Sequence, residues 1–131
     1  MIDLTILMEP VGKGRPRVTR RGNKVVTYTP NATAHAESII RAQAMTLEEH
    51  YTKETPLLLT ATFFRAPPQK LPKGRSKPIT RPDWDNYGKL LSDALEGFAY
   101  DNDSQITTAI IKKRYGYPPR IELQIIEDMN T

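Results

Sequence analysis

The apolar run from Leu57 to Phe64 constrains the fold of this chain more than any other feature. It follows Pro56, reads LLLTATFF, and is too short to cross a bilayer. A short, nearly continuous apolar run of this kind is typical of a strand that is buried on both faces. We therefore expect a β-sheet that other elements cover.

The remaining periodicities predict the elements around this strand. Further strands are expected at residues 2–8, 24–29, 105–115 and 120–127. Helices are expected at residues 32–51 and 86–96, with Asp85 as the N-cap of the second helix and Gly97 as its stop. The order predicts an α/β (α+β) fold, in which a small mixed β-sheet is flanked by two helices, and a single domain over residues 1–131.

The charges are unevenly distributed along the chain, although the formal net charge is only +4. Cations fill two acid-free segments, 13–24 and 65–81, and acids crowd between Asp83 and Asp103. Proline and glycine in residues 66–82 exclude regular structure there, and a long loop of this kind is often functional. Cationic segments beside an acidic cluster indicate a polyanionic partner, and the alternative is that both segments are solvated loops.

The composition also excludes several classes of protein. There is no cysteine, so disulfides, thiolate metal sites and thiol nucleophiles are ruled out. We find neither an apolar run long enough to span a membrane nor a secretory signal, and we expect a cytoplasmic protein. The histidines, His35 and His50, do not form a zinc-protease pattern, and neither a P-loop nor a serine elbow is present.

The segment around Asp83 and Asp85 carries the strongest chemical signal. If both residues are extended, their carboxylates lie on one face and repel each other unless a cation lies between them. A hard divalent ion such as Mg²⁺ would supply that cation. Trp84 would then face the other way, into the core or into a dimer contact.

Lys89 and Asp93 continue the pattern along the second helix. Asp85, Lys89 and Asp93 are spaced at i, i+4 and i+8, so they share one stripe. A lysine on this stripe can neutralise charge on a phosphate or protonate a leaving oxygen. The structural alternative is that Asp85 caps the helix and Lys89 makes surface pairs, but this alternative does not explain Asp83.

A calcium loop is the other possible role for the acids near residue 101. Asp101, Asn102 and Asp103 begin like an EF-hand, but Ile106 stands at the turn-glycine position and Lys112 at the position of the bidentate glutamate. The calcium-loop interpretation is therefore rejected.

The central motif resembles a known family. The string Pro82-Asp83-Trp84-Asp85-Asn86, followed by Lys89, Asp93 and Gly97, is similar to the signature of the RusA-type crossover junction endodeoxyribonucleases, the Holliday junction resolvases. Further blocks resemble the family at residues 10–17, 28–30, 103–105 and 112–113, so the likeness covers nearly the whole chain in order.

The resemblance implies a small α/β homodimer, often encoded by phages or prophages, that resolves four-way DNA junctions by paired nicks in recombination and repair. The implied cofactor is Mg²⁺, with Mn²⁺ as a substitute, and neither an organic cofactor nor a membrane is involved. Carried over by position, the metal-binding and catalytic acids are Asp83, Asp85 and Asp103, and the catalytic lysine is Lys89. The family usually has two adjacent acids where this chain has Asn102-Asp103, so Asp101 stays an alternative third ligand.

DNA binding is expected to rest on the cationic segments and on a basic run in the 105–115 strand. The candidates are Lys13, Arg15, Arg17, Arg20, Arg21, Lys73, Arg75, Lys77, Lys112, Lys113 and Arg114. Because side chains alternate along a strand, at least one cation of the 112–114 run is expected to point away from DNA.

Other functions stay open at this point. One is a non-catalytic nucleic-acid-binding module, in which the acids only balance charge. Another is a metal-dependent nuclease that acts on another branched or duplex substrate and uses the same acids. Neither the preferred cutting sequence nor the number of metals follows from the sequence.

Overall fold

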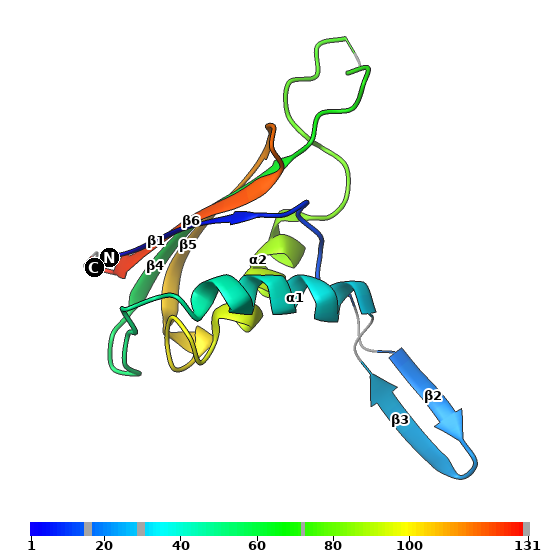
Figure 1. Ribbon diagram of the computed structural model, residues 1–131, viewed down its shortest axis with the longest axis vertical. Helices are drawn as coiled ribbons and strands as arrows, with labels where there is room; N and C mark the ends of the chain where they lie inside the picture. The colour runs from blue at the N-terminus through cyan, green and yellow to red at the C-terminus, as the bar shows by residue number, and fades with distance from the viewer. Residues whose placement is uncertain (15–16, 29–30, 72, 130–131) are drawn as a thin grey trace.

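A mixed four-stranded sheet forms the centre of the structure, a computed structural model that describes residues 1–14, 17–28, 31–71 and 73–129. The strands and helices are, in chain order, β1 (Ile2–Leu7), β2 (Arg17–Arg21), β3 (Lys24–Tyr28), α1 (Asn31–Ala44), β4 (Leu57–Arg65), α2 (Trp84–Leu95), the 3-10 turn η1 (Asp103–Gln105), β5 (Ile106–Tyr115) and β6 (Arg120–Glu127). The sheet order is β1-β6-β4-β5, in which β4 and β5 run parallel and the other neighbours antiparallel. Both helices lie on one side of this sheet (Figure 1). The predicted mixed sheet with two helices is confirmed.

The central strand β4 is buried mainly on one face. Leu57, Leu59, Ala61 and Phe63 are buried, and the residues between them are half-buried. The alternation follows from the pleat, because the helices cover only one side of the sheet. The expectation that this strand is buried on both faces was therefore wrong.

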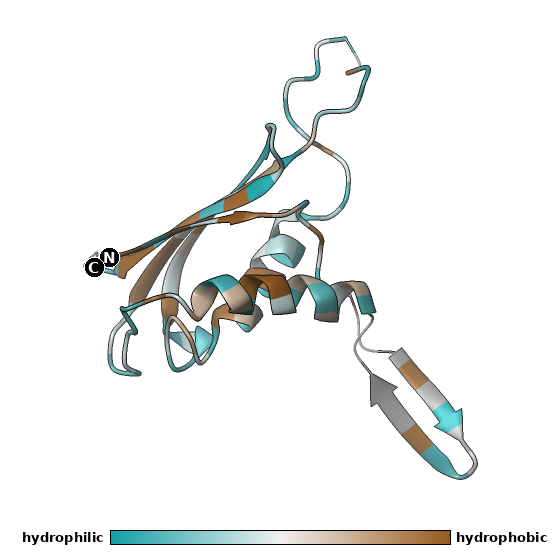
Figure 2. Cartoon of the chain, in the orientation of Figure 1, coloured by the Kyte–Doolittle hydropathy of each residue, from teal (hydrophilic) through white to brown (hydrophobic). Residues whose placement is uncertain are grey.

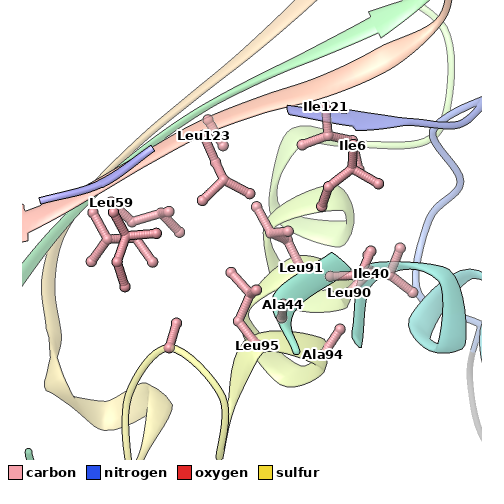
Figure 3. Packing of buried hydrophobic residues seen from close by; sticks show 14 of the residues in the cluster. Ile6, Ile40, Ala44, Leu59, Leu90, Leu91, Ala94, Leu95, Ile121 and Leu123 are labelled. Atoms are coloured by element: carbon pink, nitrogen blue, oxygen red, sulfur yellow. The ribbon is translucent and has the colours of Figure 1, made fainter. Parts of the chain in front are cut away.

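The core fills the space between the sheet and the helices. Figure 3 shows Ile40 of α1 and Leu91 and Leu95 of α2 on the helical side, and Ile121 and Leu123 of β6 on the sheet side. Burial of apolar side chains of this size contributes about 1.5–3 kcal/mol for each residue. The packed core fixes α2 relative to the sheet, and α2 carries the acidic motif.

Two segments project from the sheet and the helices. One is the hairpin β2–β3, in which Arg17 pairs with Tyr28 and Arg21 with Lys24. The other is the loop of residues 66–82, which is largely hydrophilic (Figure 2). They leave the body in different directions, and α2 lies between them in the view of Figure 1. No helix in the described part of the chain is both long and apolar enough to cross a membrane.

The end of the first helix and the strand β2 differ most from the sequence-based expectation. The first helix was expected to reach residue 51 but ends at Ala44, where the backbone N–H of Leu47 bonds the Ala44 carbonyl and closes a turn. No strand was expected at residues 17–21, whose arginines show no apolar alternation. They form β2, since β3 pairs with them and Gly22 takes the positive φ of 61° that the tight turn requires.

Candidate active site

The acidic motif lies where the bent chain of residues 80–82 leads into helix α2. Asp83 is the N-cap residue, with an extended backbone at φ −69° and ψ 157°, and the helix begins at Trp84. Asp85 therefore belongs to the first helical turn, so the expectation that it caps the helix was wrong. The condition considered from the sequence, an extended backbone at both aspartates, holds for Asp83 but not for Asp85. The helix starts at Trp84, earlier than its apolar periodicity indicates.

The turn into the helix brings both carboxylates to one hollow. This hollow of about 420 Å³ is lined by Lys13, Asp83, Asp85, Asn86 and Lys89, and we call it the acid hollow. The carboxylate of Asp83 makes no capping hydrogen bond within the described residues. The carboxylate of Asp85 accepts a hydrogen bond from the N–H of its neighbour Asn86 at 3.0 Å. The predicted convergence of two aspartates and a lysine is thus present, although through a different backbone geometry.

Trp84 lies outside the core, because 62% of its surface is exposed. It lines a second hollow of about 300 Å³ together with Asp85, Lys89 and Asp103. The core placement considered from the sequence is therefore wrong for this residue. A role in a dimer contact stays a prediction.

Lys89 connects the two hollows. Its ammonium lies 3.1 Å from Asp93 and 3.9 Å from Asp103, and the side chain is 60% exposed. The hydrogen bond to Asp93 and the charge of that residue raise the pKa of Lys89 above its ordinary value. Lys89 therefore carries a positive charge at neutral pH and is suited to stabilise negative charge rather than to accept a proton.

Asp103 is placed by the short turn η1. The Asn102 side chain accepts from the Ser104 N–H at 2.9 Å, and the Gln105 side chain accepts from the Asn102 N–H at 2.8 Å. This capping box turns the chain tightly, and the buried Gln105 amide also donates to the carbonyl of Thr52. The asparagine that departs from the family pattern thus has a structural role here.

The environment of Asp103 disfavours its charged form. Burial, the hydrogen-bonding contact with Asp93 and the charge of Glu96 raise the pKa of Asp103, and the charge of Lys89 opposes them. For Asp93, burial also acts to raise the pKa, but hydrogen bonds from Lys13 and Lys89 outweigh it and leave the pKa below its ordinary value. The carboxylates of Asp93 and Asp103 therefore lie close together. The ammonium groups of Lys13 and Lys89 stabilise the negative charge mainly at Asp93.

Asp101 is engaged away from the acid hollow. Its carboxylate contacts His50 Nε2 at 2.6 Å and accepts the Lys53 N–H at 2.9 Å. His50 Nδ1 lies 2.9 Å from the Phe98 carbonyl, and this hydrogen bond, followed by that of Asp101, raises the pKa of His50. Asp103 rather than Asp101 therefore borders the site, which agrees with the preference for Asp103 drawn from spacing.

The donor set suits a hard cation but is not preassembled. Nowhere in residues 1–14, 17–28, 31–71 and 73–129 do three His, Cys, Asp or Glu side chains form a group ready to hold a metal. The oxygens of Asp83 and Asp85 nevertheless line one hollow, and Mg²⁺ is commonly bound through one or two carboxylates, with water and substrate phosphate as further ligands. These two residues fit such an ion, and the shared binding by Asp83, Asp85 and Asp103 stays a prediction.

The predicted DNA-binding cations separate into those near the acids and those at a distance. Lys13 lines the acid hollow. Lys113 lies opposite the buried Phe63, on the helical face, and Lys112 lies opposite Thr62, on the other face. Burial and the charge of Arg65 lower the pKa of Lys113. The expectation that these neighbouring cations alternate faces is confirmed.

Other predicted cations lie on the two projecting segments. Lys73, Arg75 and Lys77 line a hollow within the 66–82 loop. Arg20 is exposed on β2. Arg15 lies outside the described residues, as do the side chains of Arg17 and Arg21. Arg114 is half-buried on β5 and donates to the carbonyl of Lys113.

Sequence reasoning missed two residues that shape the site. Arg65, counted only as part of a basic segment, donates to the Tyr87 hydroxyl at 2.8 Å and to the Thr80 carbonyl at 2.6 Å, and so anchors the chain that leads to Asp83. Glu37 is 6% exposed on α1 and pairs with Lys13. An acid on the same helical stripe as Ile40 and Ala44 was the available signal for Glu37.

Comparisons with known proteins identify the family. The chain matches the family described as Endodeoxyribonuclease RusA over residues 8–126. It is 31% identical to the protein YqaN of Bacillus subtilis (strain 168) over 136 aligned positions, which cover 96% of each chain. It is 40% identical over 81 positions, 61% of each chain, to the crossover junction endodeoxyribonuclease rusA of Lactococcus phage r1t. The chain belongs to the RusA endodeoxyribonuclease family.

Proposed function

We propose that this protein is an Mg²⁺-dependent endodeoxyribonuclease that resolves four-way DNA junctions by paired nicking. The observation that supports the proposal most strongly is the acid hollow, in which Asp83 and Asp85 face the same space as Lys13 and Lys89. Family membership supports phosphodiester cleavage in DNA, and the name of the phage relative supports a crossover junction as the substrate.

The carboxylates of Asp83 and Asp85 would hold the metal, with Asp103 contributing from the neighbouring hollow. When bound, Mg²⁺ supplies positive charge at the phosphate and activates water for hydrolysis. The crowded carboxylates favour such an ion because a cation relieves their mutual repulsion.

Lys89 would act on the phosphate itself. Its ammonium is exposed on the side of the acid hollow and keeps its proton because Asp93 raises its pKa. It therefore places a fixed positive charge where negative charge develops during cleavage. Its hydrogen bond to Asp93 limits the rotamers it can adopt, so the charge is held in place before DNA binds.

The two projecting segments would hold the DNA backbone around the cut. Residues 66–82 lead directly into Asp83, and the hairpin begins shortly after Lys13. Cations on these segments would contact phosphates without reading sequence. Two symmetric cuts require two symmetric sites, which a two-fold homodimer supplies.

The direct test is cleavage of a labelled mobile four-way junction, a matched flap and a matched duplex, each with Mg²⁺, with Mn²⁺ and with EDTA. We expect symmetric nicks in the junction with either metal, little cutting of duplex, and none in EDTA. Preferential cutting of the flap would support a nuclease with another branched substrate. Binding without cleavage of any substrate would support the non-catalytic module. Sedimentation of the free protein tests the homodimer, and a monomeric active enzyme would contradict it.

A further inference from the structure

Glu37 is a buried carboxylate that none of the steps above uses. It is 6% exposed and lies on α1, outside the acidic motif. Its oxygens pair with Lys13 at 3.1 Å and with Arg41 at 3.0 Å. Because burial of a charge is costly unless the charge is paired, a carboxylate at this position requires cations beside it.

Lys13 is the cation that connects Glu37 with the acid hollow. Its ammonium contacts Glu37 of α1 and Asp93 of α2, each at 3.1 Å, and its side chain is 24% exposed. The other carboxylate oxygen of Asp93 lies 3.1 Å from the ammonium of Lys89. One carboxylate thus holds two ammonium groups, and both lysines line the acid hollow.

The backbone around Lys13 is fixed as well as its side chain. The Gly14 N–H donates to the buried hydroxyl of Thr33 at 2.7 Å, and the Lys13 N–H donates to the Asn86 carbonyl at 3.4 Å. Gly12 packs so closely on Pro82 that an added Cβ would lie 2.8 Å from the Pro82 Cβ. Contacts of its side chain and of the neighbouring backbone thus hold Lys13 in place, unlike a solvated surface lysine.

We propose that Glu37 is a positioning residue that holds Lys13 at the acid hollow, so that Lys13 and Lys89, spaced by Asp93, form a two-lysine clamp for the phosphate to be cut. This inference rests on the proposed function. Glu37 lies too deep to contact DNA and acts only through Lys13, whereas Lys13 contacts the phosphate. The clamp exists before DNA binds, so the lysines need no reorganisation when charge develops on the phosphate.

The test is a double-mutant cycle on the full chain, measured as the single-turnover rate of junction cleavage with enzyme in excess and Mg²⁺ present. The variants are Lys13→Ala, Glu37→Gln and the double variant, and Glu54→Gln on an exposed loop is the matched control for a lost acid. We expect each single change to slow cleavage by about 10- to 100-fold, as expected for a displaced catalytic group. The double variant should be no slower than Lys13→Ala, because Glu37 acts through Lys13.

Two further measurements separate positioning from loss of folding. The junction dissociation constant and the thermal midpoint of Glu37→Gln should stay close to those of Glu54→Gln. If Glu37→Gln does not fold, Glu37→Asp keeps the buried charge but shortens its reach by one carbon, and we expect the same loss of rate. Cleavage at the control rate, or a double variant slowed by the product of the single effects, would overturn the inference.

A readout without DNA distinguishes this inference from the proposed function. In the free protein, an amine-reactive ester should label Lys13 slowly in the wild type and several-fold faster in Glu37→Gln, while the exposed Lys53 labels equally in both. Equal labelling of Lys13 in the two proteins would overturn the positioning role. Absence of junction cleavage by the wild type would instead refute the proposed function, and with it the catalytic half of the inference.

Discussion

Removal of the Tyr87 hydroxyl should destabilise the fold by a predictable amount. Tyr87 is fully buried, its ring stacks on Phe63 at a centroid distance of 4.6 Å, and its hydroxyl accepts the Arg65 Nε–H at 2.8 Å. Tyr87→Phe keeps the ring stacking and deletes only the acceptor. A hydrogen bond to a charged group contributes about 1.5–3 kcal/mol. Since Arg65 is half-buried and keeps its bonds to Thr80, we expect a loss of about 1.5 kcal/mol.

This loss converts to a shift in melting temperature. Unfolding entropy is about 2.1 cal/mol/K per residue. For a chain of 131 residues, about 1.5 kcal/mol therefore lowers the midpoint by about 5 °C. Thermal unfolding followed by circular dichroism measures the shift. Tyr117→Phe is the matched control, because Tyr117 is 81% exposed and should change the midpoint by less than about 2 °C.

The same substitution should slow junction cleavage, because Arg65 joins Tyr87 to the chain segment that precedes Asp83. If Tyr87→Phe has the same thermal midpoint as Tyr117→Phe, the contact of Arg65 with the Tyr87 hydroxyl does not stabilise the fold. The anchoring of this segment by Arg65 would then be refuted.

Three further predictions concern pH, packing and salt. The hydrogen bond to the Phe98 carbonyl and the contact with Asp101 raise the pKa of His50, so these contacts stabilise the fold fully below about pH 6.5, while Asp101 is ionised, and less as the pH rises through the folded-state value. Urea unfolding should show this decline, and His50→Gln should remove it. Gly12→Ala forces a Cβ within 2.8 Å of Pro82 and should cost about 1–3 kcal/mol by chemical denaturation, and unchanged stability would contradict the close packing. Lys73→Ala should reduce the slope of log affinity for junction DNA against log salt by about 0.9, and an unchanged slope would remove this residue from the phosphate contacts.

Much of the fold follows from periodicity. The alternating apolar residues predicted β1, and the strand predicted at residues 120–127 has the same bounds as β6 in the structure. Gly97 ends α2 with φ 86°, as its position indicated. Strand β2 was missed because its arginines show no alternation, and only its pairing partner makes it a strand.

The candidate site was predictable in its composition but not in its geometry. Asp83, Asp85 and Lys89 do line one hollow. The helical backbone at Asp85 was not anticipated, since an N-cap is hard to place from sequence when acids occupy neighbouring positions. Glu37 was missed for a different reason, because its partner Lys13 is distant in sequence and meets it only in the folded chain.

The measurement that tests the central claim most directly compares wild type with Asp83→Asn on one four-way junction, with cleavage, binding and stability recorded together. The side chain of Asp83 makes no capping bond in the described part of the chain, so stability should change by less than about 0.5 kcal/mol and the junction should still bind. Cleavage in Mg²⁺ should be lost. Retained cleavage by Asp83→Asn, or parallel loss of folding and binding, would contradict the assignment of the acid hollow as the catalytic centre.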